Sequence, residues 1–276
     1  MSSRELPEFE HLLLERDEAL VWLTLNRPNE LNAINRPLLD EIFRAFDWLA
    51  EDKESRVIII RGAGRCFSSG YDVSGKAPGE YATEEPGIIE DFVRLRRNIE
   101  RNLAIWDFPK PVIAAVHGYC LGAVLQLVSV CDITVVADDA KIGFPSMPMG
   151  GGYISPFWVQ LVGIKRAKQM SFEPDSRISG KMASEWGWAN YSVPEAELMD
   201  TVRAHALRIA KVPAEVLLMK KMSLNRVADL AGFRTSAVLG AETNAILHTV
   251  PSVLELRDTV KEHGLKEAIR RFKSGE

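Results

Sequence analysis

The first 200 residues alternate between short apolar runs and segments with helical spacing. The apolar runs are short and rich in β-branched residues, which is typical of buried strands; they span 20–25, 56–61, 111–116 and 131–137. Between them, residues 37–52 and 91–106 carry apolar side chains at the spacing of one helix face. This alternation predicts an α/β fold.

The remaining elements are shorter, and the last third of the chain is almost wholly helical. A hairpin is expected where residues 11–15 precede the run 20–25, and a glycine- and proline-rich loop at 142–152. Short helices are expected at 155–161, 166–172 and 181–188, a strand at 191–193, and longer helices at 198–211, 214–225, 230–249 and 252–271. The many apolar positions in this tail predict that another subunit covers one of its faces.

One stretch, residues 109–132, contains a buried strand that ends in a glycine turn. Gly118 and Gly122 interrupt the apolar pattern, and from Leu121 the spacing becomes helical. A strand, turn and helix in this order leave main-chain N–H groups at the helix start, with the positive end of the helix dipole behind them. Such a turn suits an anionic oxygen; alternatively, the glycines only make a packed crossover.

A second segment repeats this arrangement. The strand at 56–61 leads into Gly62-Ala63-Gly64-Arg65 and then into FSSGYD, residues 67–72. Two such turns in one α/β chain could each present one N–H group to the same carbonyl oxygen. Two converging donors are what an oxyanion hole requires.

Three ordered motifs resemble the crotonase superfamily, also called the enoyl-CoA hydratase/isomerase family. They are LNRPNELNAI (25–34), FSSGYD (67–72) and AAVHGYCLGAVLQL (114–127), and the resemblance covers roughly residues 10–270. It implies an α/β fold of the crotonase type, a spiral of ββα units with a C-terminal helical oligomerisation region. Residues 1–200 would be the core and 201–276 the region that forms homotrimers, often stacked as hexamers.

The resemblance also implies an acyl-CoA thioester substrate, with coenzyme A entering as part of the substrate and no separate cofactor or metal. The N–H groups of Tyr71 and Ala123 would form the oxyanion hole. A further set of residues would contact the substrate or its coenzyme A portion: Arg27, Ala33, Ser69, Gly70, Asp72, Val73 and Gly122. In the family, the loop that here spans about 73–90 covers the acyl pocket.

The chain departs from the family at the two glutamates with which its hydratases add water. Gln126 and Ser146 stand at these positions, and Ile154 stands where dehalogenases and dienoyl isomerases have an aspartate. Glutamine cannot exchange a proton near neutral pH, and serine does so only beside a base. These residues argue against ordinary hydration, whereas the predicted oxyanion hole does not depend on them.

Two kinds of chemistry remain open. Decarboxylation or carbon–carbon cleavage would form an enolate without removal of an α-proton. Alternatively, an isomerase or a related enzyme would take its acid or base from another part of the chain. The candidates are Asp72, Glu80, Glu84, Glu85, Glu90, Asp91, His117, Glu242 and His248. A homologue that binds acyl-CoA without catalysis is the alternative function.

Composition limits the classes of function and the cellular compartment that the chain fits. The chain has 276 residues, a formal net charge of −4 and three cysteines without metal-type spacing. An acidic balance without a basic stripe disfavours nucleic-acid binding. The sparse cysteines fit a reducing compartment, and neither a signal-type apolar segment nor a membrane span is apparent. We therefore expect a cytoplasmic enzyme that does not associate with membranes.

Overall fold

A computed structural model describes residues 5–73, 87–144, 146–150 and 155–275. Its strands form a six-stranded sheet in the order β1-β2-β3-β4-β6-β9 and a three-stranded sheet in the order β5-β7-β8. The strands are β1 (Leu12–Asp17), β2 (Leu20–Leu25), β3 (Val57–Gly62), β4 (Val112–Val116), β5 (Tyr119–Leu121), β6 (Ile133–Ala137), β7 (Lys141–Gly143), β8 (Arg177–Ser179) and β9 (Tyr191–Val193). The helices are α1 (Arg36–Glu51), α2 (Ile88–Trp106), α3 (Val124–Ser129), α4 (Ser155–Val162), α5 (Ile164–Phe172), α6 (Gly180–Trp186), α7 (Leu198–Ala210), α8 (Ala214–Leu230), α9 (Phe233–Leu247), α10 (Pro251–His263) and α11 (Leu265–Ser274).

The larger sheet confirms the predicted buried strands. β1 and β2 form an antiparallel hairpin closed by Glu18 and Ala19, and β2, β3, β4, β6 and β9 pair in parallel. All residues of β2 and β4 are buried, as continuous apolar runs require in a sheet covered on both faces. The carboxyl ends of β3 and β4 therefore lie side by side, and each leads into one of the two glycine turns.

The helix predicted after the second glycine turn is present, but its predicted start at Leu121 was wrong. Residues 119–121 form β5, which pairs with β7, and α3 begins at Val124 and has only six residues. A three-residue strand has too few positions to show the alternation that identifies strands. The smaller sheet, which includes the unpredicted β8, therefore depends on long-range pairing.

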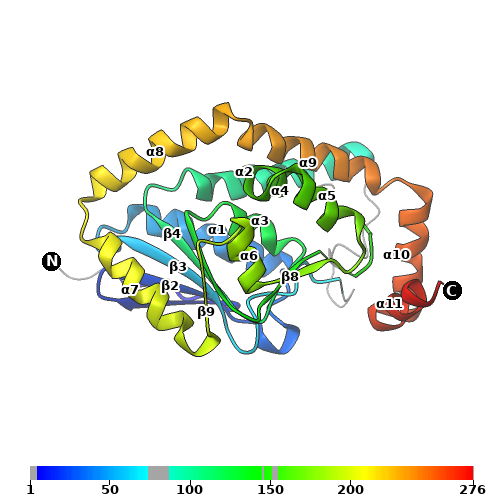
Figure 1. The fold of residues 1–276 in the computed structure, drawn as a ribbon, viewed down its shortest axis with the longest axis horizontal. Helices are drawn as coiled ribbons and strands as arrows, with labels where there is room; N and C mark the ends of the chain where they lie inside the picture. The colour runs from blue at the N-terminus through cyan, green and yellow to red at the C-terminus, as the bar shows by residue number, and fades with distance from the viewer. Residues whose placement is uncertain (1–4, 74–86, 145, 151–154, 276) are drawn as a thin grey trace.

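The helical tail wraps around one end of the molecule. α8 and α9 run along one side, and α10 and α11 turn down across the end of the molecule that carries the C-terminus (Figure 1). The single helix predicted for 252–271 is wrong, because Gly264 at φ +78° separates α10 from α11. Among the described residues, no helix is both long and apolar enough to cross a bilayer.

Two apolar clusters organise the interior of the described part of the chain. The main cluster contains the larger sheet and the helices that cover it. The smaller one joins Val260 of α10 and Ala268 of α11 to Met147, with Met149 partly buried against it. The last two helices thus pack on the loop that carries Ser146.

Candidate active site

The site is built where the two glycine turns cross. The Ser68 N–H donates to the Tyr119 carbonyl at 2.9 Å, and the Leu121 N–H donates to the Ser68 carbonyl at 3.1 Å. A Cβ on Gly118 would lie 2.2 Å from the carbonyl oxygen of Arg65, so only glycine permits this approach at φ +57°. The crossing brings the segments after β3 and β4 into backbone contact.

Tyr71 is held by its neighbours. The Gly70 carbonyl accepts from the Ile34 N–H at 2.8 Å, and the Asp72 N–H donates to the Ile34 carbonyl at 3.0 Å. Because successive N–H groups of extended backbone point in opposite directions, the N–H of Tyr71 faces away from Ile34.

Ala123 lies beside this segment. A Cβ built on Gly70 would be 3.5 Å from the main-chain nitrogen of Ala123. Ala123 is the N-cap residue of α3, so its N–H has no partner within that helix. Tyr71 and Ala123 line one small pocket between α1, α2 and α3, together with Ile34, Leu39, Ile42, Phe43, Asn98, Asn102, Val124, Gln126 and Leu127. The structure therefore brings the two predicted donors to the same cavity.

Arg27 lies within the site framework. Its guanidinium donates to the carbonyl of Ala33 and to Oδ2 of Asp72 at 3.0 Å, and the side chain is 13% exposed. The nearly buried pair ties the first motif (25–34) to the second (67–72). Breaking such a pair by removing one partner costs about 3–5 kcal/mol, because the other charge stays buried.

The other predicted substrate contacts flank this framework. The Ser69 N–H donates to the Leu31 carbonyl at 3.0 Å, and the Gly122 N–H donates to the Gly143 carbonyl at 3.0 Å. Gly70 has φ +99°, and a Cβ there would lie 2.7 Å from the carbonyl oxygen of Leu121; Val73 is half-buried at the end of its described segment. The amides of Ser69 and Gly122 thus hold the backbone in place.

Gln126 lies inside the pocket and is 1% exposed. Its Oε1 accepts from Nδ2 of Asn102 at 3.3 Å, whereas its Nε2 has no hydrogen-bond partner among the described residues. A buried donor without a partner costs about 1–3 kcal/mol. The amide N–H is therefore available to a ligand that enters the pocket.

Ser146 belongs to a different network. Its hydroxyl donates to Oδ1 of Asp175 at 2.6 Å and accepts from Arg177 at 3.1 Å, and Lys273 of α11 binds Oδ2 of the same aspartate at 2.7 Å. Burial raises the pKa of Asp175, but the hydrogen bonds from Lys273 and Ser146 and the charge of Arg177 hold it below its ordinary value. Gln126 and Ser146 thus have unlike surroundings.

The remaining candidate acids and bases differ in their surroundings. Glu80, Glu84 and Glu85 lie outside the described residues, as does Ile154, whereas Glu90 and Glu242 are exposed. Nε2 of His117 is 2.9 Å from the carbonyl of Gly64, so this histidine bridges the two turns.

Asp91 and His248, in contrast, meet at 2.6 Å although they are 157 residues apart. Sequence reasoning named them separately and missed their contact. It also missed Asn98 and Asn102, which line the pocket from the buried face of α2. The sequence did contain a signal for them, because both asparagines lie on the otherwise apolar face of the predicted helix.

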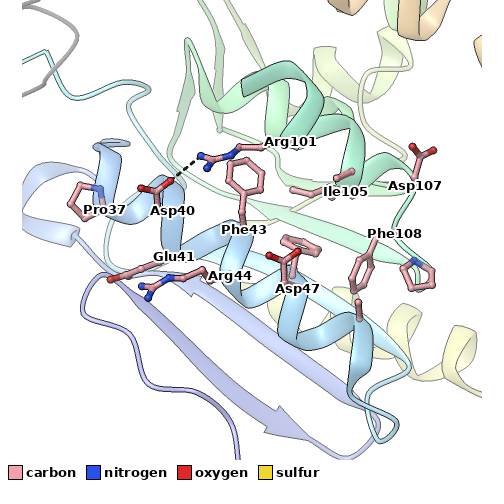
Figure 2. A pocket seen from close by; sticks show the side chains of 14 residues that line it. Pro37, Asp40, Glu41, Phe43, Arg44, Asp47, Arg101, Ile105, Asp107 and Phe108 are labelled. Carbon is pink, nitrogen blue, oxygen red and sulfur yellow. Dashed lines mark hydrogen bonds and ion pairs between the residues drawn. The ribbon is translucent and has the colours of Figure 1, made fainter. Parts of the chain in front are cut away.

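A wider groove lies between α1 and α2 (Figure 2). There Arg101 donates to Asp40 at 2.8 Å, and its guanidinium carbon lies 5.1 Å from the ring centre of Phe43. Phe43 lines this groove and the small pocket, but neither Tyr71 nor Ala123 lines the groove. The wider groove therefore lacks the main-chain donors.

The fold and the crossed turns define a crotonase-type α/β protein, and comparison with known proteins agrees. Residues 15–251 match the family described as Enoyl-CoA hydratase/isomerase. The chain therefore belongs to the enoyl-CoA hydratase/isomerase family and is an enzyme of that family.

Relatives and solved structures support this assignment over most of the chain. "Probable enoyl-CoA hydratase echA8" of Mycobacterium tuberculosis (strain CDC 1551 / Oshkosh) is 32% identical over 80% of this chain and 83% of the relative. "Short-chain-enoyl-CoA hydratase" of Clostridium acetobutylicum is 31% identical over 79% and 82%. A crystal structure of an enoyl-CoA hydratase/isomerase-family protein from Novosphingobium aromaticivorans DSM 12444 superposes with a TM-score of 0.88 at 41% identity, covering 94% of each chain.

Proposed function

We propose that this enzyme stabilises the enolate or oxyanion of an acyl-CoA thioester with the main-chain N–H groups of Tyr71 and Ala123. The observation that carries the proposal is that these residues, on turns from two different strands, line one pocket. One donor of this kind contributes about 3–4 kcal/mol to transition-state stabilisation. Coenzyme A is part of the substrate, and the chain needs no separate cofactor for this step.

The reaction differs from two-glutamate hydration. Gln126 supplies an amide N–H instead of a carboxylate, and the Ser146 hydroxyl is bound to Asp175. A neutral amide can orient a water or an acyl group but cannot accept its proton. Isomerisation, decarboxylation or carbon–carbon cleavage fits these residues better than addition of water does.

Residues 201–276 would join copies of the chain into a homotrimer or a stack of two trimers. The support is a set of exposed apolar side chains on α8: Met219, Met222, Leu224, Val227 and Leu230. Exposed apolar patches of this kind mark protein interfaces. The core would then span residues 1–200.

A matched pair of substitutions at one position tests the oxyanion hole. Ala123 has φ −59°, which suits proline, so Ala123→Pro removes the N–H with little change in backbone angle, whereas Ala123→Gly keeps the N–H. Turnover of the enzyme's thioester should fall about 100- to 1,000-fold in the proline variant and little in the glycine variant. The bulky Ala123→Trp should abolish turnover by filling the pocket.

Binding and hydration assays complete the test. Calorimetry should show that acyl-CoA still binds the proline variant, because coenzyme A contacts remain. Incubation with crotonyl-CoA should leave the conjugated enoyl absorbance unchanged by hydration. Equal turnover in the proline and glycine variants would refute the role of the Ala123 N–H.

A further inference from the structure

Asp91 of α2 and His248, the residue that follows α9, form a close pair. Nδ1 of His248 lies 2.6 Å from Oδ2 of Asp91. A carboxylate can only accept, so Nδ1 carries the proton and Nε2 presents its lone pair on the other side of the ring. This is the arrangement in which a carboxylate orients a histidine base.

The carboxylate of the pair is built into the fold. Asp91 is 2% exposed, and its Oδ1 also binds the guanidinium of Arg94. Burial raises the pKa of Asp91, but the hydrogen bonds from His248 and Arg94 outweigh it and hold the pKa below its ordinary value. The carboxylate therefore stays charged near neutral pH and holds the imidazole in one orientation.

The pair lies on the same helix face as two residues that line the pocket. Asp91, Asn98 and Asn102 share the buried face of α2, and the two asparagines line the pocket with Tyr71 and Ala123. Seven helical residues separate Asp91 from Asn98, a rise of about 10 Å. The pair thus lies further along α2 than the pocket residues do.

The loop that carries Ser146 approaches the same histidine. A Cβ on Gly150 would lie 3.1 Å from Nε2 of His248 and 2.8 Å from Oδ1 of Asn244. A side chain at residue 150 would press on Nε2 and on Asn244, so glycine allows the loop to approach the histidine this closely. Nδ2 of Asn244 lies 3.1 Å from the same nitrogen, so an entering acyl group must replace this neutral hydrogen bond.

We propose that His248, positioned by Asp91, is the catalytic acid/base of the enzyme and acts on Cγ of an enoyl-CoA thioester. The proposal rests on the oxyanion hole, because the charge that proton removal creates must be held at the thioester oxygen. It supplies the acid/base function that Gln126 cannot provide. It also assigns a residue of the helical tail to the reaction.

The proton transfer is balanced without another reactant. The Cγ–H bond breaks and its proton moves to Nε2. The electron pair forms the Cβ–Cγ double bond, the former Cα–Cβ π pair forms the Cα–carbonyl double bond, and the carbonyl π pair moves to the oxygen. The resulting dienolate accepts a proton back at Cγ, which restores the substrate, or at Cα, which gives the 3-enoyl isomer.

Hydrogen exchange in D₂O tests the proposal with crotonyl-CoA as the probe. Mass spectrometry and proton NMR should show deuterium at Cγ with wild-type enzyme and with the control His205→Gln, a histidine on α7. His248→Gln should lower the exchange rate at least about 100-fold, within the usual range for general acid–base catalysis. Wild-type exchange at Cγ that His248→Gln leaves unchanged would overturn the proposal.

Asp91→Asn separates positioning from simple structural support. Among the described residues, the Asp91 carboxylate contacts His248, and the Arg94 guanidinium contacts Asp91. Without the carboxylate, the exchange rate at Cγ should fall while the affinity for crotonyl-CoA stays the same, which a structural defect alone would not cause. This variant also carries the test if His248→Gln does not fold.

The outcomes separate this proposal from the proposed function. Loss of turnover in Ala123→Pro, together with a wild-type enzyme that binds crotonyl-CoA but incorporates no deuterium, would overturn the role of His248 and leave the oxyanion hole standing. Absence of acyl-CoA binding in the wild type would contradict the proposed function itself.

Discussion

The regions around Gln126 and around Ser146 are held together by different forces. Around Gln126, backbone hydrogen bonds and glycines at close approaches hold the turns, as the contacts of Ser68 and Gly118 illustrate. Around Ser146, side-chain ion pairs and the packing of α10 and α11 hold the loop. The backbone around Gln126 can therefore keep its geometry when side chains there are replaced. The loop around Ser146 depends on the side chains that form its ion pairs and apolar contacts.

The largest expected effect concerns the glycine crossing. Gly118→Ala should lower the free energy of unfolding by about 3 kcal/mol or more, because it combines a left-handed conformation with a 2.2 Å clash against Arg65. Gly187→Ala is the matched control, since Gly187 is also left-handed (φ +85°) but its Cβ position has no atom nearer than 3.7 Å. It should cost only about 1–2 kcal/mol. Urea denaturation followed by circular dichroism compares them, and equal losses would contradict the steric explanation.

Effects of intermediate size on stability and turnover should distinguish Gln126 from Ser146. Gln126→Leu removes a buried amide nitrogen without a partner among the described residues, so it should raise the free energy of unfolding by about 1 kcal/mol. Turnover should nevertheless fall about tenfold, because the pocket loses a donor. Asn102 keeps a partner in this variant, since it also donates to the carbonyl of Asn98.

Ser146→Ala should have the opposite pattern. Loss of the hydrogen bond to Asp175 should lower the free energy of unfolding by about 1 kcal/mol, while turnover changes less than about twofold. Thermal unfolding and steady-state kinetics on both variants provide the measurement. If both substitutions changed turnover equally, the two regions would not differ in function.

The smallest expected effect concerns the ion pair between Lys273 and Asp175. Because the folded pKa of Asp175 lies below its ordinary value, its stabilising contribution is full above pH 3.8 and is lost as the pH falls through the folded pKa. Amide hydrogen exchange should therefore show that α10 and α11 lose protection in acid and not between pH 7 and pH 5. Lys273→Ala should cost under about 1 kcal/mol at pH 7, because Lys273 is half-exposed.

Lys266→Ala provides the control for this experiment. Lys266 is an exposed lysine on the same helix, so its replacement removes the same charge and leaves Asp175 paired. Equal loss of protection in the two variants would show that Lys273 has no specific role in holding α11.

The sequence predicted the long elements and the glycine turns better than the short strands and the long-range contacts. The strand at 20–25, the helix α1 within one residue at each end, and both glycine turns follow from local patterns that the structure confirms. β5 and β8 were missed because strands of three residues show no periodicity, and Gly264 was not recognised as the end of α10. The contacts of Ser146 with Asp175, and of Asp91 with His248, join distant parts of the chain and leave no local pattern.

The proposed oxyanion hole is tested most directly by the carbonyl of a bound substrate. An acyl-CoA labelled with ¹³C at the thioester carbon should show a downfield shift of its carbonyl resonance on binding to the wild type and to Ala123→Gly, because two N–H groups polarise the bond. The shift should be clearly smaller in Ala123→Pro, which lacks one donor. A bound resonance that matches the free thioester, or equal shifts in the glycine and proline variants, would contradict the account.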